Sequence, residues 1–334
     1  MENKSQAYGL AKGPVIPVDI SKKYRVIMTG DIACDVDDLY AAAYALMSEK
    51  LDIVGICSEQ WGDSWSKTSM EDGYQELLKL TKAMGVMDVP ICRGAAKAIA
   101  RNEETGEFEY EKNDASQLII DEAMKDDPRP LVVCCTGPMT NTAIAYLEKP
   151  EIAGRMIVVG NDVPGNGWEF NLGNDCHATN ILMDSPVEWY LNNFHSELSD
   201  KASLTSLYQE LKNCGAVGEY LWNRTVYANE QLAVRIAEDM ANGFVGQGMN
   251  EVEKRGCVPN GELFELNDIG AVARVLSMGY SKIEMVDARH LTRMVGGLDP
   301  DYVPVRKVKT FTEPTDVAAF MKDFYDKMQY YYGE

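Results

Sequence analysis

Short apolar runs alternate with longer amphipathic stretches along the first half of the chain. The runs have the continuity of strands buried on both faces, and the stretches between them space their apolar residues as helices do. The predicted strands are 26–28, 51–57, 131–135, 155–160 and a segment near Val187. The predicted helices are 37–50, 71–84, 117–125 and 138–147, with a short segment at 89–94 between the second and third. This alternation indicates a parallel sheet.

The second half of the chain is richer in helical spacing. Helices dominate from about Ser203 to Met240, and a glycine-rich connection follows at 243–248. A helix at 268–278, a strand at 282–287 and a helix at 315–328 complete the chain. No proline-rich or serine-rich linker and no internal repeat divides it. We therefore expect one α/β domain over residues 1–334, with a mostly parallel central sheet flanked by helices and a lead-in at 1–22.

The charge balance narrows the range of partners. The chain has 52 acidic and 32 basic residues, for a formal net charge of -20, and no long basic run. Neither nucleic acid nor an anionic membrane is therefore expected as a partner. The N-terminal 25 residues contain no apolar core of signal-peptide length, and nowhere do about 18 apolar residues run together. The sequence predicts a cytoplasmic protein.

Cysteine and histidine usage argues against a zinc or disulfide protein. The eight cysteines show no C-x-x-C pair, and several lie inside apolar runs, as buried reduced thiols do. Only three histidines are present, without an H-E-x-x-H motif. Any metal would need oxygen ligands.

In an open parallel sheet, ligands bind beyond the carboxyl ends of the strands, so the loops after strands are where chemistry is expected. The loop after the first strand places Asp31, Asp35, Asp37 and Asp38 within eight residues, leading into a helix. Carboxylates this close repel one another unless a cation compensates them. Capping of the helix would explain one or two of them, but not four. A metal site and a solvated acidic turn both remain open at this point.

Three later segments carry further candidate groups. The turn 136–141 (TGPMTN) can aim a backbone carbonyl, a ligand for hard cations, toward the first loop. The segment 165–171 sets carboxylate and amide side chains around two aromatic rings, which suits a polyhydroxyl ligand such as ribose. Asp268 begins a predicted helix, where an N-cap is the simpler interpretation. Each segment alone is also explained as an ordinary turn, surface loop or cap.

Taken in this order, the four segments resemble the inosine-uridine nucleoside hydrolase family, whose first strand ends in a D-x-D-x-x-x-D-D motif. The similarity runs from about Tyr24 to the last helix. IVGICSEQWGD resembles the family's second strand and loop, VPICRGA its VPVYxGA segment, and TGPMTN its TGPLTN segment. The resemblance implies the nucleoside hydrolase fold, hydrolysis of the N-glycosidic bond of a ribonucleoside to ribose and free base, and assembly as a homodimer or homotetramer.

The resemblance also implies a site for one Ca²⁺. Its protein ligands would be Asp31, Asp38, the backbone carbonyl of Thr136 and Asp268, with water and the ribose hydroxyls completing the shell. Asp37 would take a proton from a calcium-bound water, which then attacks the anomeric carbon. The positions matching substrate contacts in the family are Asp63 or Ser64, Asn161 or Asn166, Glu169, Asn171 and Asn267.

Several positions depart from the family pattern. Thr29 stands where the family has the outermost Asp of its first motif, and two extra residues introduce Asp35, which becomes an alternative to Asp37 as the base. The histidine that precedes the fourth-loop Asp in the family is Asn267 here, which can hydrogen-bond a base but cannot give up a proton.

Without that histidine, solvent, another acid or aromatic stacking has to help the base leave. Trp222 and Tyr227 fall in the helical region that lines the base pocket in relatives. Trp61 and Trp168 are the other aromatic candidates, and His177 and His195 are the candidate acids.

Two other functions are compatible with an acidic loop. A catalytically impaired relative that only binds a nucleoside or sugar would keep the Ca²⁺ site but lack a competent base, and would bind without releasing reducing sugar. An Asp-dependent phosphatase would carry Asp-x-Asp directly at the strand end with a catalytic Lys downstream. The spacing of DIACD does not fit the second of these.

Overall fold

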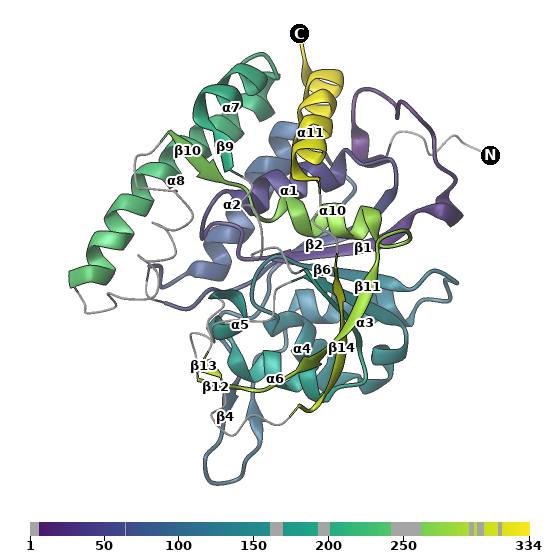
Figure 1. Ribbon diagram of the computed structural model, residues 1–334, viewed down its shortest axis with the longest axis vertical. Coiled ribbons are helices and arrows are strands. Elements are labelled where there is room, and N and C mark those ends of the chain that lie inside the picture. The colour runs from purple at the N-terminus through teal and green to yellow at the C-terminus, as the bar shows by residue number, and fades with distance from the viewer. Residues whose placement is uncertain are drawn as a thin grey trace.

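The computed structural model describes residues 7–63, 65–160, 170–192, 201–241, 262–293, 297–298, 304–312 and 316–334. Its centre is an eight-stranded sheet in the order β11-β14-β8-β7-β6-β1-β2-β3 (Figure 1). The strands are β1 (Tyr24–Gly30), β2 (Leu51–Ser58), β3 (Ile91–Cys92), β6 (Leu131–Cys135), β7 (Met156–Gly160), β8 (Glu188–Leu191), β11 (Ile283–Ala288) and β14 (Arg306–Phe311). All pairs are parallel except β11 with β14, so the expected fold class is confirmed.

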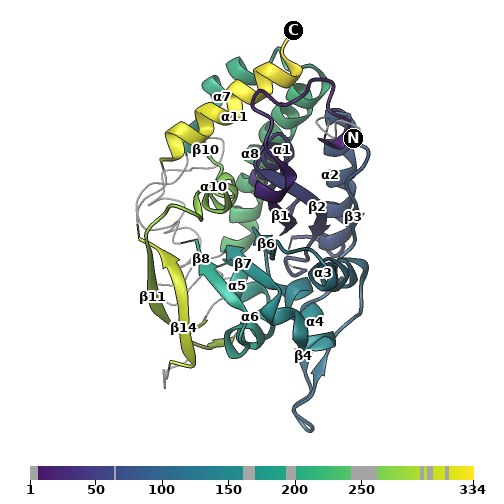
Figure 2. The ribbon, with the colours of Figure 1, turned by 90° about the vertical axis from the view of Figure 1, so that its right-hand side faces the viewer.

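Helices cover both faces of this sheet (Figures 1 and 2). Side chains alternate along β1, so that Val26 and Met28 join the core on one face and Ile27 joins the core on the other. On the first face, α1 (Asp37–Leu46), α2 (Ser69–Met84) and α10 (Ile269–Ser277) pack on the sheet. Helices α7 (Leu204–Leu211), α8 (Gly215–Ala241) and α11 (Val317–Tyr332) pack outside them and share the same hydrophobic core. The second is covered by α3 (Asp114–Met124), α4 (Thr140–Glu148), α5 (Phe170–Asn174) and α6 (Cys176–Asp184).

The element boundaries mostly follow local chemistry. Helix α2 ends at Gly85, whose φ of 73° is a conformation that glycine adopts without a steric cost. Helix α3 begins with a capping box between Asn113 and Ser116. The predicted helix 37–50 stops earlier, at Leu46, because the chain turns through Met47 and enters β2 at Leu51.

Some elements were missed by the hydrophobic pattern. Strand β14, helix α6 and three small antiparallel pairs were not predicted. These pairs are β4 (Ala100–Arg101) with β5 (Phe108–Glu109), β9 (Lys201–Ser203) with β10 (Leu263–Glu265), and β12 (Leu291–Arg293) with β13 (Gly297–Leu298). Short 3₁₀ turns occur at Ala7–Gly9, Ile20–Lys22 and Pro150–Gly154. The glycine-rich connection at 243–248 lies outside the described residues.

The order of the strands fixes where a ligand is expected. From β1 the chain adds β2 and β3 on one side, whereas β6, on the other side of β1, is followed by β7 and β8 farther out. Strand addition therefore reverses between β1 and β6. In open parallel sheets the ligand lies at such a reversal, beyond the carboxyl ends of the two strands.

None of the helices in the described part of the chain combines the length and the apolar character needed to cross a lipid bilayer.

Candidate metal centre

The acidic first loop and the Thr136 turn leave the sheet side by side. Strands β1 and β6 are neighbours in parallel register, with Thr29 opposite Cys135. Asp31 follows the end of β1 and Thr136 follows the end of β6, so both lie at the reversal of strand order. The structure therefore brings together two segments that are about one hundred residues apart in the sequence.

Three carboxylates converge at this point from two helix N-termini. One oxygen each from Asp37, Asp38 and Asp268 lies within 4.8 Å of the others. Asp37 and Asp38 are the first two residues of α1, and Asp268 immediately precedes α10, which packs against α1. The side chain of Asp268, at the N-cap position of α10, makes no cap hydrogen bond, and the N-cap position of α1 is Val36 and not one of the aspartates. Capping therefore does not account for these carboxylates.

Asp31 and Asp35 add negative charge to this group of three. Asp31 is only 4% exposed, and its charge is the largest electrostatic contribution that raises the pKa of Asp38. Asp35 accepts a hydrogen bond from the backbone N–H of Val36 at 2.7 Å, and its charge raises the pKa of Asp37. We refer to Asp31, Asp35, Asp37, Asp38 and Asp268 as the acidic cluster.

Burial and mutual repulsion raise the pKa of the central carboxyls. Burial is the largest cause for Asp37, Asp38 and Asp268, and each is raised further by its acidic neighbours. For Asp268 those neighbours are the other four members of the cluster. Such a group is stabilised either by protons or by a cation. The described donors are all oxygen atoms, which suits a hard divalent cation such as Ca²⁺.

Thr136 connects the turn to the cluster. Its hydroxyl donates a hydrogen bond to Oδ1 of Asp38, and its backbone carbonyl accepts one from Nδ2 of Asn171 at 2.9 Å. A carbonyl oxygen has two lone pairs, so this bond leaves it able to face a cation as well. Asn171, a predicted ribose contact, therefore lies in α5 where it orients the Thr136 carbonyl.

Two glycines allow the acidic side chains to approach the backbone. A Cβ at Gly30 would lie 2.0 Å from Oδ1 of Asp38 and 2.4 Å from Oγ1 of Thr136. A Cβ at Gly137 would lie 2.5 Å from the backbone nitrogen of Asp31 and 2.8 Å from its Oδ1. The cluster fits only because neither position carries a side chain.

A further buried carboxylate lies beside the end of β1. Glu59 is completely buried and accepts hydrogen bonds from the Thr29 hydroxyl at 2.7 Å and from the backbone N–H of Asn141 at 3.2 Å. Burial raises the pKa of Glu59, whereas these hydrogen bonds oppose the rise. Thr29 is the position at which the resembled family carries an acidic residue. The residue that follows the neighbouring strand β2 is therefore a carboxylate that contacts Thr29.

Not every predicted residue lies at the cluster. Asp63 has a side chain that is 81% exposed and pairs with Lys67 at 3.1 Å. Asn267 immediately precedes Asp268, at the cluster. The other predicted contacts, Ser64, Asn161, Asn166 and Glu169, lie outside the described residues, as do Trp168 and His195.

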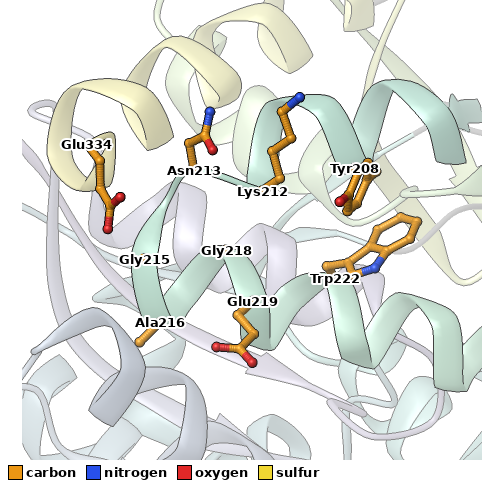
Figure 3. Close-up of a pocket in the computed structure, with 9 residues that line it drawn as sticks. All are labelled: Tyr208, Lys212, Asn213, Gly215, Ala216, Gly218, Glu219, Trp222 and Glu334. Carbon is orange, nitrogen blue, oxygen red and sulfur yellow. The ribbon is translucent and has the colours of Figure 1, made fainter.

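Trp222 lies in a separate cavity, shown in Figure 3. Its ring packs against Tyr208, with centroids 5.1 Å apart, and the cavity of about 480 Å³ is lined by α7, the start of α8 and the chain end at Glu334. Arg235, which contacts the first loop, is roughly 20 Å farther along α8 at 1.5 Å per residue. The structure therefore does not bring Trp222 to the cluster.

The remaining aromatic and histidine candidates have other surroundings. Trp61 is buried, with 4% of its surface exposed. Tyr227 is 47% exposed and lies beneath Arg224, with 4.9 Å between the guanidinium carbon and the ring centroid. His177 packs near Phe108, with ring centroids 6.1 Å apart.

Sequence reasoning missed Glu59, Gly30 and Gly137, and it also missed a group formed by Trp65, Phe170 and Arg235. The Trp65 and Phe170 rings stack with centroids 5.8 Å apart, and the guanidinium carbon of Arg235 lies 5.0 Å from the Trp65 ring centroid. A tryptophan in a loop, a phenylalanine at the start of α5 and an arginine on α8 have no fixed spacing in the sequence. No sequence signal could have grouped them.

Comparison of the sequence with known proteins finds a matching family. The sequence model of the inosine-uridine preferring nucleoside hydrolase family matches residues 26–318. The pyrimidine-specific ribonucleoside hydrolase RihA of Citrobacter koseri is 26% identical over 175 residues, which cover 45% of this chain and 54% of that protein. The uncharacterized protein C1683.06c of Schizosaccharomyces pombe is 25% identical over 178 residues, 45% of this chain and 55% of that protein. The chain thus spans about half the length of these curated relatives.

Solved structures share the fold over nearly the whole chain. A plant nucleoside hydrolase, PpNRh1, superimposes with a TM-score of 0.63 at 16% identity, covering 91% of this chain and 98% of the other. The purine-preferring ribonucleoside hydrolase of Gardnerella vaginalis gives a TM-score of 0.61 at 22% identity, with the same coverage of 91% and 98%.

The glycine contacts predict that Gly30→Ala weakens cation binding, because the new Cβ would displace Asp38 and Thr136. Titration calorimetry with CaCl₂ should show a loss of affinity of about tenfold or more, equivalent to roughly 1.4 kcal/mol. The control is Gly154→Ala, since a Cβ at Gly154 meets no heavy atom within 4 Å. If Gly30→Ala binds calcium as tightly as the control, these two side chains do not shape the cation site.

The contact between Thr29 and Glu59 predicts a rescue. Glu59→Gln replaces a buried carboxylate that accepts two hydrogen bonds, and Thr29→Asp sets a second carboxylate beside Glu59. Each change alone should lower the free energy of unfolding by roughly 1–3 kcal/mol. The double variant Thr29→Asp with Glu59→Gln restores a single carboxylate and should recover much of this loss. Urea unfolding of the four proteins measures the coupling. Simple addition of the two losses would argue against a shared carboxylate position.

Proposed function

This chain belongs to the inosine-uridine preferring nucleoside hydrolase family, and from that membership we propose that it is a calcium-dependent hydrolase of ribonucleosides. The proposed reaction cleaves the N-glycosidic bond with water, giving ribose and the free base. The observation that carries the proposal is the acidic cluster, where Asp37, Asp38 and Asp268 bring one oxygen each within 4.8 Å at the reversal of strand order.

We assign the cation to Asp31, Asp38, Asp268 and the backbone carbonyl of Thr136. The mutual repulsion of the carboxylates and their all-oxygen donor set support this choice. Asn171 holds the Thr136 carbonyl in place, and Gly30 and Gly137 leave the space that Asp38 and Asp31 occupy. When bound, the divalent cation supplies positive charge that makes a nearby water more acidic and gives ribose hydroxyls an attachment.

Asp37 is the proposed general base. It is partly buried, and burial together with the charges of Asp35 and Asp38 raises its pKa well above the ordinary value. A carboxylate with a raised pKa accepts a proton more readily as water attacks the anomeric carbon. Asp35 is the alternative base. Both carboxylates accept a backbone N–H, Asp35 that of Val36 and Asp37 its own, so hydrogen bonding does not separate them.

The negative charge of the cluster also acts on the sugar. Breaking the glycosidic bond leaves positive charge on the ribose ring, as in other glycoside hydrolyses, and fixed carboxylates nearby stabilise that charge. Glu169, Asn171 and either Asn161 or Asn166 remain the proposed contacts to the ribose hydroxyls, with Asn267 toward the base. The exposed Asp63, paired with Lys67, and the distant Trp222 are left out of this assignment. Cytoplasmic localisation and assembly as a homodimer or homotetramer remain predictions.

We expect release of reducing sugar from inosine or uridine that stops on addition of a chelator and returns with excess CaCl₂. Asp31→Ala or Asp38→Ala should abolish turnover, and Asp37→Asn should lower kcat by roughly 10²–10⁴-fold, the usual contribution of a general base. The control is Asp326→Asn, because Asp326 is an exposed partner of Lys322 on α11. Tight binding of nucleoside without turnover would instead support the catalytically impaired binding protein.

The raised pKa values predict how calcium acts at different pH. Each of these carboxyls has a folded-state pKa above the ordinary 3.8. Its contribution to stability is fully present below the ordinary pKa and is lost as the pH rises through the raised pKa. The metal-free protein should therefore lose stability from about pH 4 upward, and CaCl₂ should raise Tm more at about pH 7.5 than at about pH 5. Scanning fluorimetry measures both shifts. Equal shifts would show that these carboxyls do not bind the cation.

A further inference from the structure

Arg235 brings a positive charge to the acidic first loop. It lies on α8, is partly buried, and its guanidinium donates a hydrogen bond to the backbone carbonyl of Cys34, one residue before Asp35. Its charge lowers the pKa of Cys34, whereas Asp31, Asp35 and Asp38 raise it. The Arg235 guanidinium and the acidic cluster therefore lie close to the same segment of the first loop, around Cys34.

A stack of aromatic rings also connects Arg235 to the helix that contacts the Thr136 turn. The guanidinium lies over Trp65 at 5.0 Å, and Trp65 stacks on Phe170 with an angle of 17° between the ring planes. Phe170 is followed by Asn171, whose amide donates to the Thr136 carbonyl. Arg235 is thus linked to the cluster through Cys34 on one side and through Trp65, Phe170 and Asn171 on the other.

The chemistry of the proposed reaction needs such a group. The cluster stabilises positive charge on the sugar, but it repels the electron-rich base that must leave. Asn267, where the resembled family has a histidine, cannot supply a proton. An arginine keeps its charge at any relevant pH and presents several planar N–H donors, and an aromatic face beside it suits a planar ring.

We propose that Arg235 contacts the nucleobase and stabilises the negative charge that develops on it as the glycosidic bond breaks, with Trp65 forming the adjacent wall. This inference rests on the proposed hydrolase function. The water oxygen bonds to the anomeric carbon, the electron pair of the C–N bond passes to the base nitrogen, and Asp37 takes the proton from water. Arg235 donates hydrogen bonds without losing a proton, and the base takes its proton from solvent.

The test compares leaving groups that differ in their need for help. The nitrophenolate of p-nitrophenyl β-D-ribofuranoside leaves without stabilisation, whereas the base of inosine or uridine does not. For each protein we compare kcat/KM for the nitrophenyl riboside with kcat/KM for inosine or uridine, whichever is cleaved faster. In Arg235→Gln the ratio of the first to the second should be about tenfold or more higher than in the wild type. Arg235→Lys retains a charge and should recover part of the change. Arg224→Gln, on the same helix but paired with Glu76 at 3.2 Å, should keep the wild-type ratio.

A second readout does not depend on turnover. With CaCl₂ present, calorimetric titration of the free base released by that nucleoside should show weaker binding to Arg235→Gln than to the wild type or Arg224→Gln. Equal loss on both substrates, with unchanged binding of the base, would mean that Arg235 only supports the first loop, and would overturn the inference. A wild-type enzyme that cleaves the nitrophenyl riboside but no natural nucleoside would also overturn it. Failure of the wild type on every riboside would instead refute the proposed hydrolase function.

Discussion

Repulsion among carboxylates is the constraint on which this molecule depends. Asp31, Asp35, Asp37, Asp38 and Asp268 lie close enough that each central member raises the pKa of another. Burial adds to the cost, because a charged carboxylate is less stable away from water. The fold holds this arrangement at the reversal of strand order, where the loops after β1 and β6 meet. In the proposed function, a single divalent cation would resolve the repulsion, and the same negative charge would favour a sugar that becomes positive during bond cleavage.

The rest of the site serves to hold these groups against their repulsion. Gly30 and Gly137 permit close packing of Asp38 and Asp31, and the Thr136 hydroxyl hydrogen-bonds Asp38. The packing of α10 against α1 brings Asp268 to the first loop from more than two hundred residues away. Beside the end of β1, Glu59 contacts Thr29 where the resembled family has an acidic residue of its own. A carboxyl group next to this strand end is thus supplied by the residue after β2.

The sequence predicted the fold class from short-range hydrophobic patterns, whereas it predicted the convergence of the first loop with Asp268 only through the resemblance to a known family. Apolar runs identified β1, β2, β6 and β7, and the order of four motifs indicated which loops would meet. Strand β14 was missed because Lys and Arg residues interrupt its apolar positions. Motif matching gave neither the exposure of Asp63, which pairs with Lys67, nor the place of Trp222 near the start of α8, away from the first loop. Contacts such as Arg235 with Cys34 arise only from tertiary packing.

A crystal structure grown with CaCl₂ and soaked with ribose tests the central claim most directly. The account predicts one strong density peak contacted by carboxylate oxygens of Asp31, Asp38 and Asp268 and by the Thr136 carbonyl, with two adjacent ribose hydroxyls on its open side. It also predicts that Asp37 lies within hydrogen-bonding distance of a water that faces the anomeric carbon. Carboxylates that hold no shared ion, or a sugar bound elsewhere with the cluster solvated, would contradict it.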